Sequence, residues 1–282
     1  MKVGIAACSN GIGINRKPEI DELISTLNML NVETVLAPHI YSEIEEYSGT
    51  DKERAEDLCS FYKDDSIDAI YDISGGDLAN GVLRFLDYDL IKNHNKMLWG
   101  YSDLTTVLNA IYTVTGNAGM LYQIRNIIGK CKDIQKKRFC DYINGVNNEL
   151  VTPEYDFLQG NSIKGIVVGG NIRCFCKLTG TRYFPDMNGK ILLLEAFSGD
   201  IGKLATMFNQ LDDMGVFTKV SGIILGTFTQ YEREEHVLSV YDLLKMHINN
   251  EVPVAKTKDI GHGQDAKGII IGKELSISKI NL

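Results

Sequence analysis

The stretch KMLWGYSDLT, residues 96–105, indicates the fold class of this chain. Residues 96–99 have the short, mostly apolar character of a buried strand, and a helical pattern of apolar residues runs from residue 104 to residue 113. Glycine, tyrosine, serine and aspartate stand at the abrupt turn between them. A strand that passes through such a turn into a helix is typical of parallel α/β sheets, whose ligand sites lie at the carboxyl ends of the strands.

The order strand, turn, helix recurs through the first half of the chain. Apolar runs bounded by turn residues predict strands at 3–7, 33–37, 69–73 and 96–99. Helical spacing predicts helices at 19–30, 51–62, 78–85, 88–91 and 104–113. The alternation predicts an α/β fold in which helices cover both faces of a parallel sheet. We place this first domain at residues 1–145.

A polar, loop-like segment at residues 144–164 separates the two halves and contains Pro153. Beyond it, strand patterns outnumber helical patterns. The predicted strands are 165–168, 190–194, 222–225, 252–255, 268–271 and 274–277. Helical spacing appears at 201–214 and at 237–248. We therefore expect a smaller, β-rich α+β domain over residues 164–282.

Composition and charge limit the classes of function. The 282 residues are 44% hydrophobic and 23% charged, which suits a globular protein with a sizeable core. The formal net charge of -8 argues against nucleic-acid binding, because the phosphate backbone repels an acidic protein. The six cysteines include no Cys-x-x-Cys pair, so we expect reduced thiols and neither a zinc site nor a redox motif. No apolar stretch approaches the roughly 18 residues of a membrane-spanning helix, so we expect a cytoplasmic protein with no membrane partner.

Ser102 is the candidate nucleophile. Its place between strand and helix resembles a nucleophile elbow, in which a sharp turn lifts a hydroxyl clear of the sheet and directs the next backbone N–H into the same space. The positive end of the following helix favours an oxyanion there. The sequence lacks the Gly-x-Ser-x-Gly pattern, however, and the alternative is that Ser102 or Asp103 only caps the helix.

Two glycines and an aspartate, Gly75-Gly76-Asp77, follow the preceding predicted strand. Because glycines have no side chain, they allow a substrate to approach the backbone closely, and a backbone N–H here would serve as a second oxyanion donor. The alternative is an ordinary turn between strand and helix. A phosphate-binding loop is disfavoured, since neither Gly-x-Gly-x-x-Gly nor a Walker-type Gly-Lys-Ser/Thr is present.

A candidate acid and a candidate base lie in the second half. Glu195 follows four apolar residues at the end of a predicted strand, where burial without a partner would cost free energy. His262 lies in a glycine-flanked loop after another strand and is the most suitable base among the five histidines. Serine, acid and histidine in this order fit a catalytic triad. The alternative for each side chain is a structural or solvated role.

Taken together, these motifs resemble the LD-carboxypeptidase family, with similarity from about residue 3 to about residue 270. The matching motifs are Gly75-Gly76-Asp77 with Asn80, Leu86-Asp87-Tyr88, Gly100-Tyr101-Ser102-Asp103-Leu104-Thr105, Gly169-Gly170-Asn171, Gly180-Thr181, Leu194-Glu195 and Gly261-His262. Within the family, the first of these motifs is similar to that of the microcin C immunity-type peptidases. The combination is far more specific than any single motif.

The resemblance implies a fold and a site. It implies a flavodoxin-like first domain and a triad of Ser102, Glu195 and His262. It also implies a homodimer, with no cofactor and no metal. The implied oxyanion donors are the backbone N–H groups of Gly76 and Asp103, and the implied substrate contacts are Gly75, Asp77 and Asn171.

The resemblance also implies a small peptide-like substrate. The family's usual reaction removes a terminal D-alanine from a cytoplasmic muropeptide, and the immunity-type branch instead hydrolyses a peptidyl- or aminoacyl-nucleotide antibiotic. We prefer the muropeptide and keep the nucleotide-linked peptide as the alternative. A non-catalytic small-ligand binder on the same scaffold is the third hypothesis.

Several departures from the family pattern leave the substrate open. Glu195 is followed by Ala196 rather than by aspartate. The run Leu121-Tyr-Gln-Ile-Arg125 stands where a Gly-Pro is common, and Ser74 stands where cell-wall enzymes often have an arginine. The immunity-type enzymes stack adenine on an aromatic residue, often a tryptophan. The only tryptophan here is Trp99, which we expect to be buried at the turn.

Overall fold

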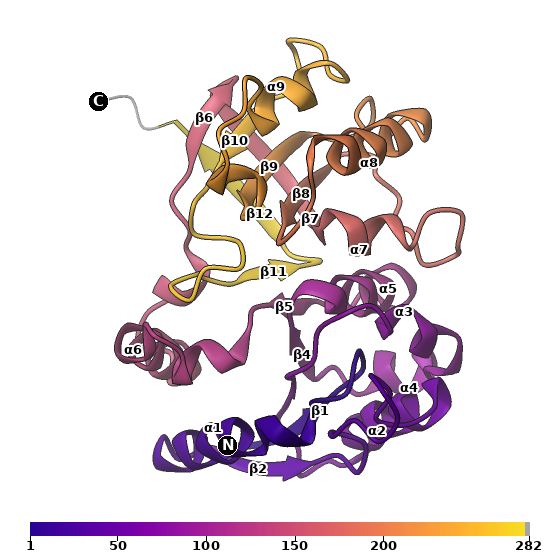
Figure 1. The fold of residues 1–282 in the computed structure, drawn as a ribbon, viewed down its shortest axis with the longest axis vertical. Coiled ribbons are helices and arrows are strands. Elements are labelled where there is room, and N and C mark those ends of the chain that lie inside the picture. Colours follow the sequence, from indigo (N-terminus) through magenta and orange to yellow (C-terminus); the bar gives the residue numbers. More distant parts are fainter. Residues whose placement is uncertain (280–282) are drawn as a thin grey trace.

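Two six-stranded sheets form the chain, one in the lower part and one in the upper part of Figure 1. A computed structural model describes residues 1–279. The first sheet has the strand order β11-β5-β4-β3-β1-β2. Its parallel strands are β1 (Lys2–Ala6), β2 (Glu33–Leu36), β3 (Ala69–Asp72), β4 (Met97–Gly100) and β5 (Gly119–Leu121). The predicted parallel sheet is confirmed, and the three-residue β5 extends it beyond the prediction.

The sixth strand of this sheet comes from the far end of the chain. The strand predicted at 268–271 forms as β11 (Ile269–Ile271), but it pairs antiparallel with β5 of the first sheet, with Ile270 opposite Met120. Figure 1 shows β11 beside β5, although they are far apart in sequence. The chain therefore returns to the first sheet after building most of the second one.

Helices cover both faces of the first sheet. Trp99 on one face packs edge-on against Phe139 and Tyr142, at ring distances of 5.9 and 5.7 Å. On the other face, Phe61 lies against the backbone of Gly4. The helices are α1 (Lys17–Met29), α2 (Asp51–Lys63), α3 (Ala79–Val82), α4 (Tyr88–Asn93), α5 (Thr105–Thr115) and α6 (Lys132–Ile143). Trp99 is buried as predicted, so its ring is occupied by core packing.

The second sheet has the order β12-β7-β8-β9-β10-β6. Its parallel centre consists of β7 (Ser162–Asn171), β8 (Lys190–Ala196), β9 (Gly222–Phe228) and β10 (Val254–Lys256). The antiparallel edges are β6 (Asp156–Gln159) and β12 (Glu274–Ser278). β6 lies within the segment predicted to be a loop. That prediction was wrong there because β6 alternates exposed and half-buried residues, as an edge strand does, and has no buried apolar run.

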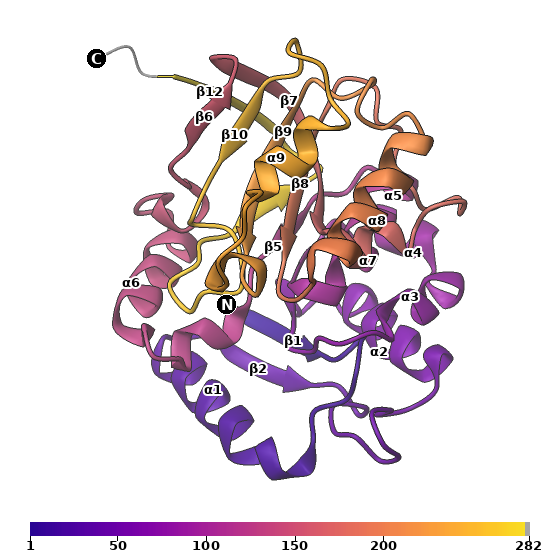
Figure 2. The same cartoon turned by 45° about the horizontal axis from the view of Figure 1, so that its top comes forward.

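Three helices accompany the second sheet among the described residues. They are α7 (Ile172–Cys176), α8 (Ile201–Asp213) and α9 (Val240–Lys245), and Figure 2 shows α9 in front of β8 and β9 and α8 beside α7. The helix predicted at 237–248 begins only at α9, because Ser239 and Asp242 form a capping box there. Among residues 1–279, no helix combines the length and apolar character needed to cross a bilayer. The predicted fold class, an α/β domain followed by a β-rich domain, is confirmed.

One seam joins the two sheets. The side chain of Asn109 on α5 accepts a hydrogen bond from the backbone N–H of Gly169 at 2.8 Å and donates one to the carbonyl of the same residue at 2.9 Å. Thr105 Oγ1 accepts a bond from the backbone N–H of Asn171 at 3.0 Å. Gly170 lies between them with φ +133°, and an added Cβ would stand 2.6 Å from Thr105 Oγ1. Glycine at position 170 is therefore needed for α5 to approach the end of β7.

Replacing Asn109 with alanine is expected to lower the free energy of unfolding by about 2–4 kcal/mol, because the buried N–H and C=O of Gly169 lose their partners. Urea unfolding followed by circular dichroism measures the change. Asn188→Ala is the matched control, since Asn188 is exposed and its amide group bonds to the neighbouring Asp186. Equal stability of the two variants would show that the seam contributes no stability.

Candidate functional site

Ser102 stands at a strained turn between strand and helix. β4 ends at Gly100, and Ser102 begins a short 3-10 segment, Ser102–Leu104, that leads into α5. Its φ of +55° lies in the left-handed region, which residues other than glycine seldom adopt. Such strain is found at functional sites, where a sharp turn exposes a nucleophile. The geometry is that of the predicted elbow, despite the absence of the flanking glycine pattern.

Glu195 and His262 are in direct contact. Glu195 lies near the end of β8 and is fully buried, with 0% of its surface exposed. His262 reaches it from the loop after β10, and the distance from Nδ1 to Glu195 Oε2 is 2.8 Å. Asn171, which pairs with Glu195 in the register of β7 and β8, donates from Nδ2 to Oε1 at 3.1 Å. Both carboxylate oxygens are therefore engaged, as a buried charge requires.

The contact with Glu195 fixes the tautomer of the His262 imidazole. When Nδ1 carries its proton toward the carboxylate, Nε2 keeps a lone pair that can accept a proton. Two rings hold the imidazole from the sides: Tyr101 at 5.0 Å, edge-on, and Phe197 at 4.9 Å. Burial, together with the neighbouring Glu195 charge, raises the pKa of Tyr101 well above its ordinary value, so Tyr101 stays a neutral phenol.

The side chain of Asp103 is buried and fixes this residue in place. Its buried carboxylate accepts hydrogen bonds from Ser9 Oγ at 2.7 Å and from the backbone N–H of Ala79 at 2.8 Å. Lys177 on the segment after α7 forms an ion pair with it at 2.6 Å. These three contacts anchor the turn after Ser102. The backbone N–H of Asp103 lies in the first turn of the helical segment, where amides have no intrahelical partner.

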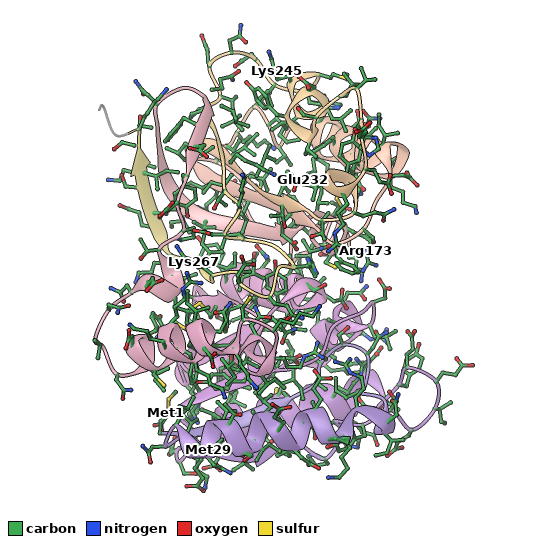
Figure 3. The ribbon with its side chains drawn as sticks, turned by 60° about the vertical axis from the view of Figure 1, so that its left-hand side comes forward. Met1, Met29, Arg173, Glu232, Lys245 and Lys267 are labelled. Carbon is green, nitrogen blue, oxygen red and sulfur yellow. The ribbon has the colours of Figure 1, made fainter. Side chains whose placement is uncertain are left out.

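The loop Gly75-Gly76-Asp77 is anchored by Asn10. Gly76 has φ +127°, and an added Cβ would stand 2.2 Å from the Asn10 Cγ, so only glycine fits. Asn10 Oδ1 also accepts the backbone N–H of Asp77 at 2.8 Å. The Asp77 carboxylate pairs with Arg173 and, at 3.1 Å, with Lys177. Figure 3 shows Arg173 at the level where the upper and lower parts of the ribbon meet.

Ser74, which stands in place of the arginine of many cell-wall enzymes, is part of a buried network beneath this loop. Its hydroxyl donates to Asp72 and accepts the backbone N–H of Ser9 at 2.9 Å. Burial raises the pKa of Asp72, although hydrogen bonds from Ser74 and Cys8 act in the opposite direction. Since Ser9 also donates to Asp103, this network connects the Gly75-Gly76-Asp77 loop to the turn that contains Ser102.

Ser102 borders two cavities. The larger has a volume of about 760 Å³, and its wall includes Ser102, His262, Phe197 and Arg125. The smaller has a volume of about 160 Å³ and is lined by Gly76, Ser102, Asn171, Arg173, Phe197 and Ser198. Within residues 1–279, no hydrogen bond joins the Ser102 hydroxyl to His262, and the two side chains face the same cavity. Catalytic contacts of this kind are commonly loose before substrate binds.

The structure thus brings together most of the residues singled out from sequence. Glu195, His262 and Asn171 form one hydrogen-bonded cluster, whereas Asp77 is engaged by two cations. Sequence reasoning missed Phe197, although its position just beyond the end of a strand was a usable signal. It also missed Lys177, for which the sequence carries no signal, because its role depends on how the region of α7 packs against α5.

Comparison with known proteins agrees with this arrangement. Two family models match the chain: the LD-carboxypeptidase N-terminal domain over residues 3–123 and the LD-carboxypeptidase C-terminal domain over residues 164–277. The first match contains Ser102, and the second contains Glu195 and His262. The two matches leave residues 124–163 between them.

Individual proteins give the same result. The chain is 28% identical to the microcin C7 self-immunity protein MccF of Escherichia coli over 263 residues, which cover 82% of this chain and 76% of that protein. It is 26% identical to the probable murein peptide carboxypeptidase of Bacillus subtilis over 270 residues, which cover 92% of this chain and 84% of that protein.

Solved structures share the fold. A structure of MccF in its wild-type apo state matches with a TM-score of 0.87 at 24% identity, covering 98% of this chain and 92% of that one. Another structure is of MccF in complex with aspartyl sulfamoyl adenosine. At this level of identity the structural likeness shows the fold alone. Since the two family models together span most of its length, the chain belongs to the LD-carboxypeptidase family.

Proposed function

We propose that this chain is a serine hydrolase of the LD-carboxypeptidase type, which cleaves the amide bond to a terminal D-amino acid in a muropeptide. The observation that carries the proposal is the 2.8 Å contact between His262 Nδ1 and Glu195, beside a serine held at φ +55°. Family membership supports carboxypeptidase chemistry in general. The muropeptide is the preferred substrate, because the family includes murein peptide carboxypeptidases.

The reaction would proceed through an acyl-enzyme. Ser102 Oγ attacks the scissile carbonyl carbon while His262 Nε2 takes the hydroxyl proton, and Glu195 stabilises the imidazolium that forms. The backbone N–H groups of Gly76 and Asp103 would donate to the oxyanion. When the C–N bond breaks, His262 returns the proton to the leaving amine. Water then attacks the acyl-serine, with His262 again as base, and releases the acid and free Ser102.

The position of His262 orients the substrate. A general acid has to reach the leaving nitrogen, and His262 lines the larger cavity but not the smaller one. The leaving residue is therefore assigned to the larger cavity and the acyl part to the side of Gly76 and Asn171. The acyl side has room to extend, because a further hollow of about 700 Å³ shares Arg173 and Ser198 with the smaller cavity.

The size of the larger cavity favours a second candidate function. Its volume of about 760 Å³ lies in the range of sites for drug-sized ligands and far exceeds the needs of one alanine. A peptidyl- or aminoacyl-nucleotide would fill more of it with its leaving group. The similarity to MccF, which has been solved with aspartyl sulfamoyl adenosine, supports the same candidate.

Purified protein is expected to release D-alanine from a muropeptide tetrapeptide, and Ser102→Ala is expected to lower kcat by about 10⁴–10⁶-fold, because it removes the nucleophile. Mass spectrometry of the products measures both. Ser66→Ala, an exposed serine far from the cavities in the fold, is the matched control. Turnover of aspartyl sulfamoyl adenosine but not of the tetrapeptide would establish the second candidate instead, and turnover of neither would favour a ligand binder.

Replacing Glu195 with glutamine is expected to lower kcat by about 10³–10⁴-fold with little change in KM, since the amide can donate to Nδ1 and hold the wrong tautomer. Steady-state kinetics on whichever substrate is turned over measures the effect. The exposed Glu274→Gln serves as the control. A Glu195→Gln enzyme that retained more than a tenth of wild-type kcat would contradict the assigned role.

A further inference from the structure

Two arginines share one carboxylate on the wall of the larger cavity. Arg16 binds Glu19 through Nε and Nη2 at 2.7–2.9 Å, and Arg125 donates from Nη1 to the same Glu19 at 3.3 Å. All three residues line the cavity that also contains Ser102 and His262. The single carboxylate of Glu19 is therefore shared by two guanidinium groups. The second guanidinium, that of Arg125, has the longer and weaker contact.

Arg125 is the less satisfied of the two cations. Only 18% of its side chain is exposed, and its Nε shares the Gln123 Oε1 at 3.3 Å. Within residues 1–279, its Nη2 makes no hydrogen bond. Burial is the main cause that lowers the pKa of the Arg125 guanidinium, and repulsion from Arg16 is the second cause. A largely buried cation with free N–H groups is a costly arrangement unless an anion completes it.

The other charges on this wall do not complete it. The remaining charged groups that line the cavity are Glu22 and Lys130, which have opposite signs, and His262, which is directed toward Glu195. The sum over the cavity, with a neutral imidazole, is one positive charge from Arg16, Arg125 and Lys130 against Glu19 and Glu22. The residues that line this cavity therefore carry one positive charge in excess, and the carboxylates of Glu45 and Glu46 lie in an adjoining hollow that Arg125 also borders.

Local structure holds Arg125 in this place. It follows β5 in the short 3-10 segment Ile124–Ile128, and the Gln123 side chain caps that segment by accepting the Arg125 backbone N–H at 3.3 Å. This run stands where a Gly-Pro is common in the family. We did not single out Arg125 as a site residue from sequence, because nothing in sequence places it opposite Glu19.

We propose that Arg125, beside Arg16, binds the anionic group of the leaving part of the substrate. This inference rests on the proposed function, since His262 assigns the leaving group to this cavity. The planar guanidinium suits a carboxylate or a phosphate, both of which offer two oxygens to parallel N–H donors. A terminal D-alanine carboxylate and a nucleotide phosphate are the two sources of that chemistry. Arg125 is then a specificity residue, and it takes no part in bond breaking.

Binding to the Ser102→Ala protein tests this without turnover. Isothermal titration compares a tetrapeptide that ends in D-alanine with one that ends in D-alaninamide, and adenosine 5′-monophosphate with adenosine. The charged member of at least one pair is expected to bind about 10- to 100-fold more tightly than its neutral partner, and Arg125→Gln is expected to abolish that preference while leaving the neutral member unchanged. Arg84→Gln, a 71% exposed arginine paired with Asp51, is the matched control.

The two pairs distinguish the source of the anion. Preference within the tetrapeptide pair identifies a terminal carboxylate, and preference within the adenosine pair identifies a phosphate. Either result supports the subsite. An equal loss of affinity for charged and neutral ligands in Arg125→Gln would overturn the subsite, as would the absence of any preference for the charged ligand before the substitution. Failure of the proposed function would instead appear as no turnover by the wild-type protein, which is a separate measurement.

A second variant guards against loss of folding. Glu19→Gln removes the carboxylate that competes with the ligand for Arg125, so it is expected to strengthen the preference for the charged member by several-fold. A purely structural bridge would give the opposite result: weaker or unchanged binding of both members. Thermal unfolding of each variant, beside Arg84→Gln, shows whether the fold is intact.

Discussion

The hydrogen bonds between α5 and the end of β7 are the contacts on which the site depends. Ser102 lies at the start of the segment that leads into α5, so the docking of α5 determines the position of Ser102. Its partner strand ends at Asn171, whose side chain bonds Glu195, and Glu195 bonds His262. A continuous series of hydrogen bonds therefore runs from the helix beside the first sheet to His262. Neither sheet holds a complete site by itself.

Charge strengthens the same junction. Lys177 and Arg173, from the second half of the chain, pair with Asp103 and Asp77, which lie on the two loops of the first half that flank Ser102. Since Asp103 is fully buried, removing Lys177 would leave a buried charge without its ion pair. These pairs hold the loops that carry Gly76 and Asp103 beside Ser102. The proposed oxyanion donors thus come from the first domain, and ion pairs from the second domain fix their loops.

Much of the fold was predictable because its signals are local. Strand, turn and helix repeat with clear apolar periodicity, and Glu195 stood out as a charge after a buried run. The pairing of β11 with β5 was not predictable, since a three-residue apolar strand carries no information about its partner. The contact of Arg125 with Glu19 was equally unpredictable, because the two residues lie 106 residues apart and only tertiary packing joins them. Local pattern thus predicted the turn at Ser102, and long-range contacts determine what surrounds it.

We infer that Ser102 is a nucleophile activated by His262 across the two domains. Reaction with a fluorophosphonate, followed by peptide mapping with mass spectrometry, tests this without knowledge of the substrate. We expect one adduct on the peptide that contains Ser102, formed rapidly by the wild-type protein and at a greatly reduced rate by His262→Ala. An unmodified Ser102, or labelling at the same rate in both proteins, would contradict it.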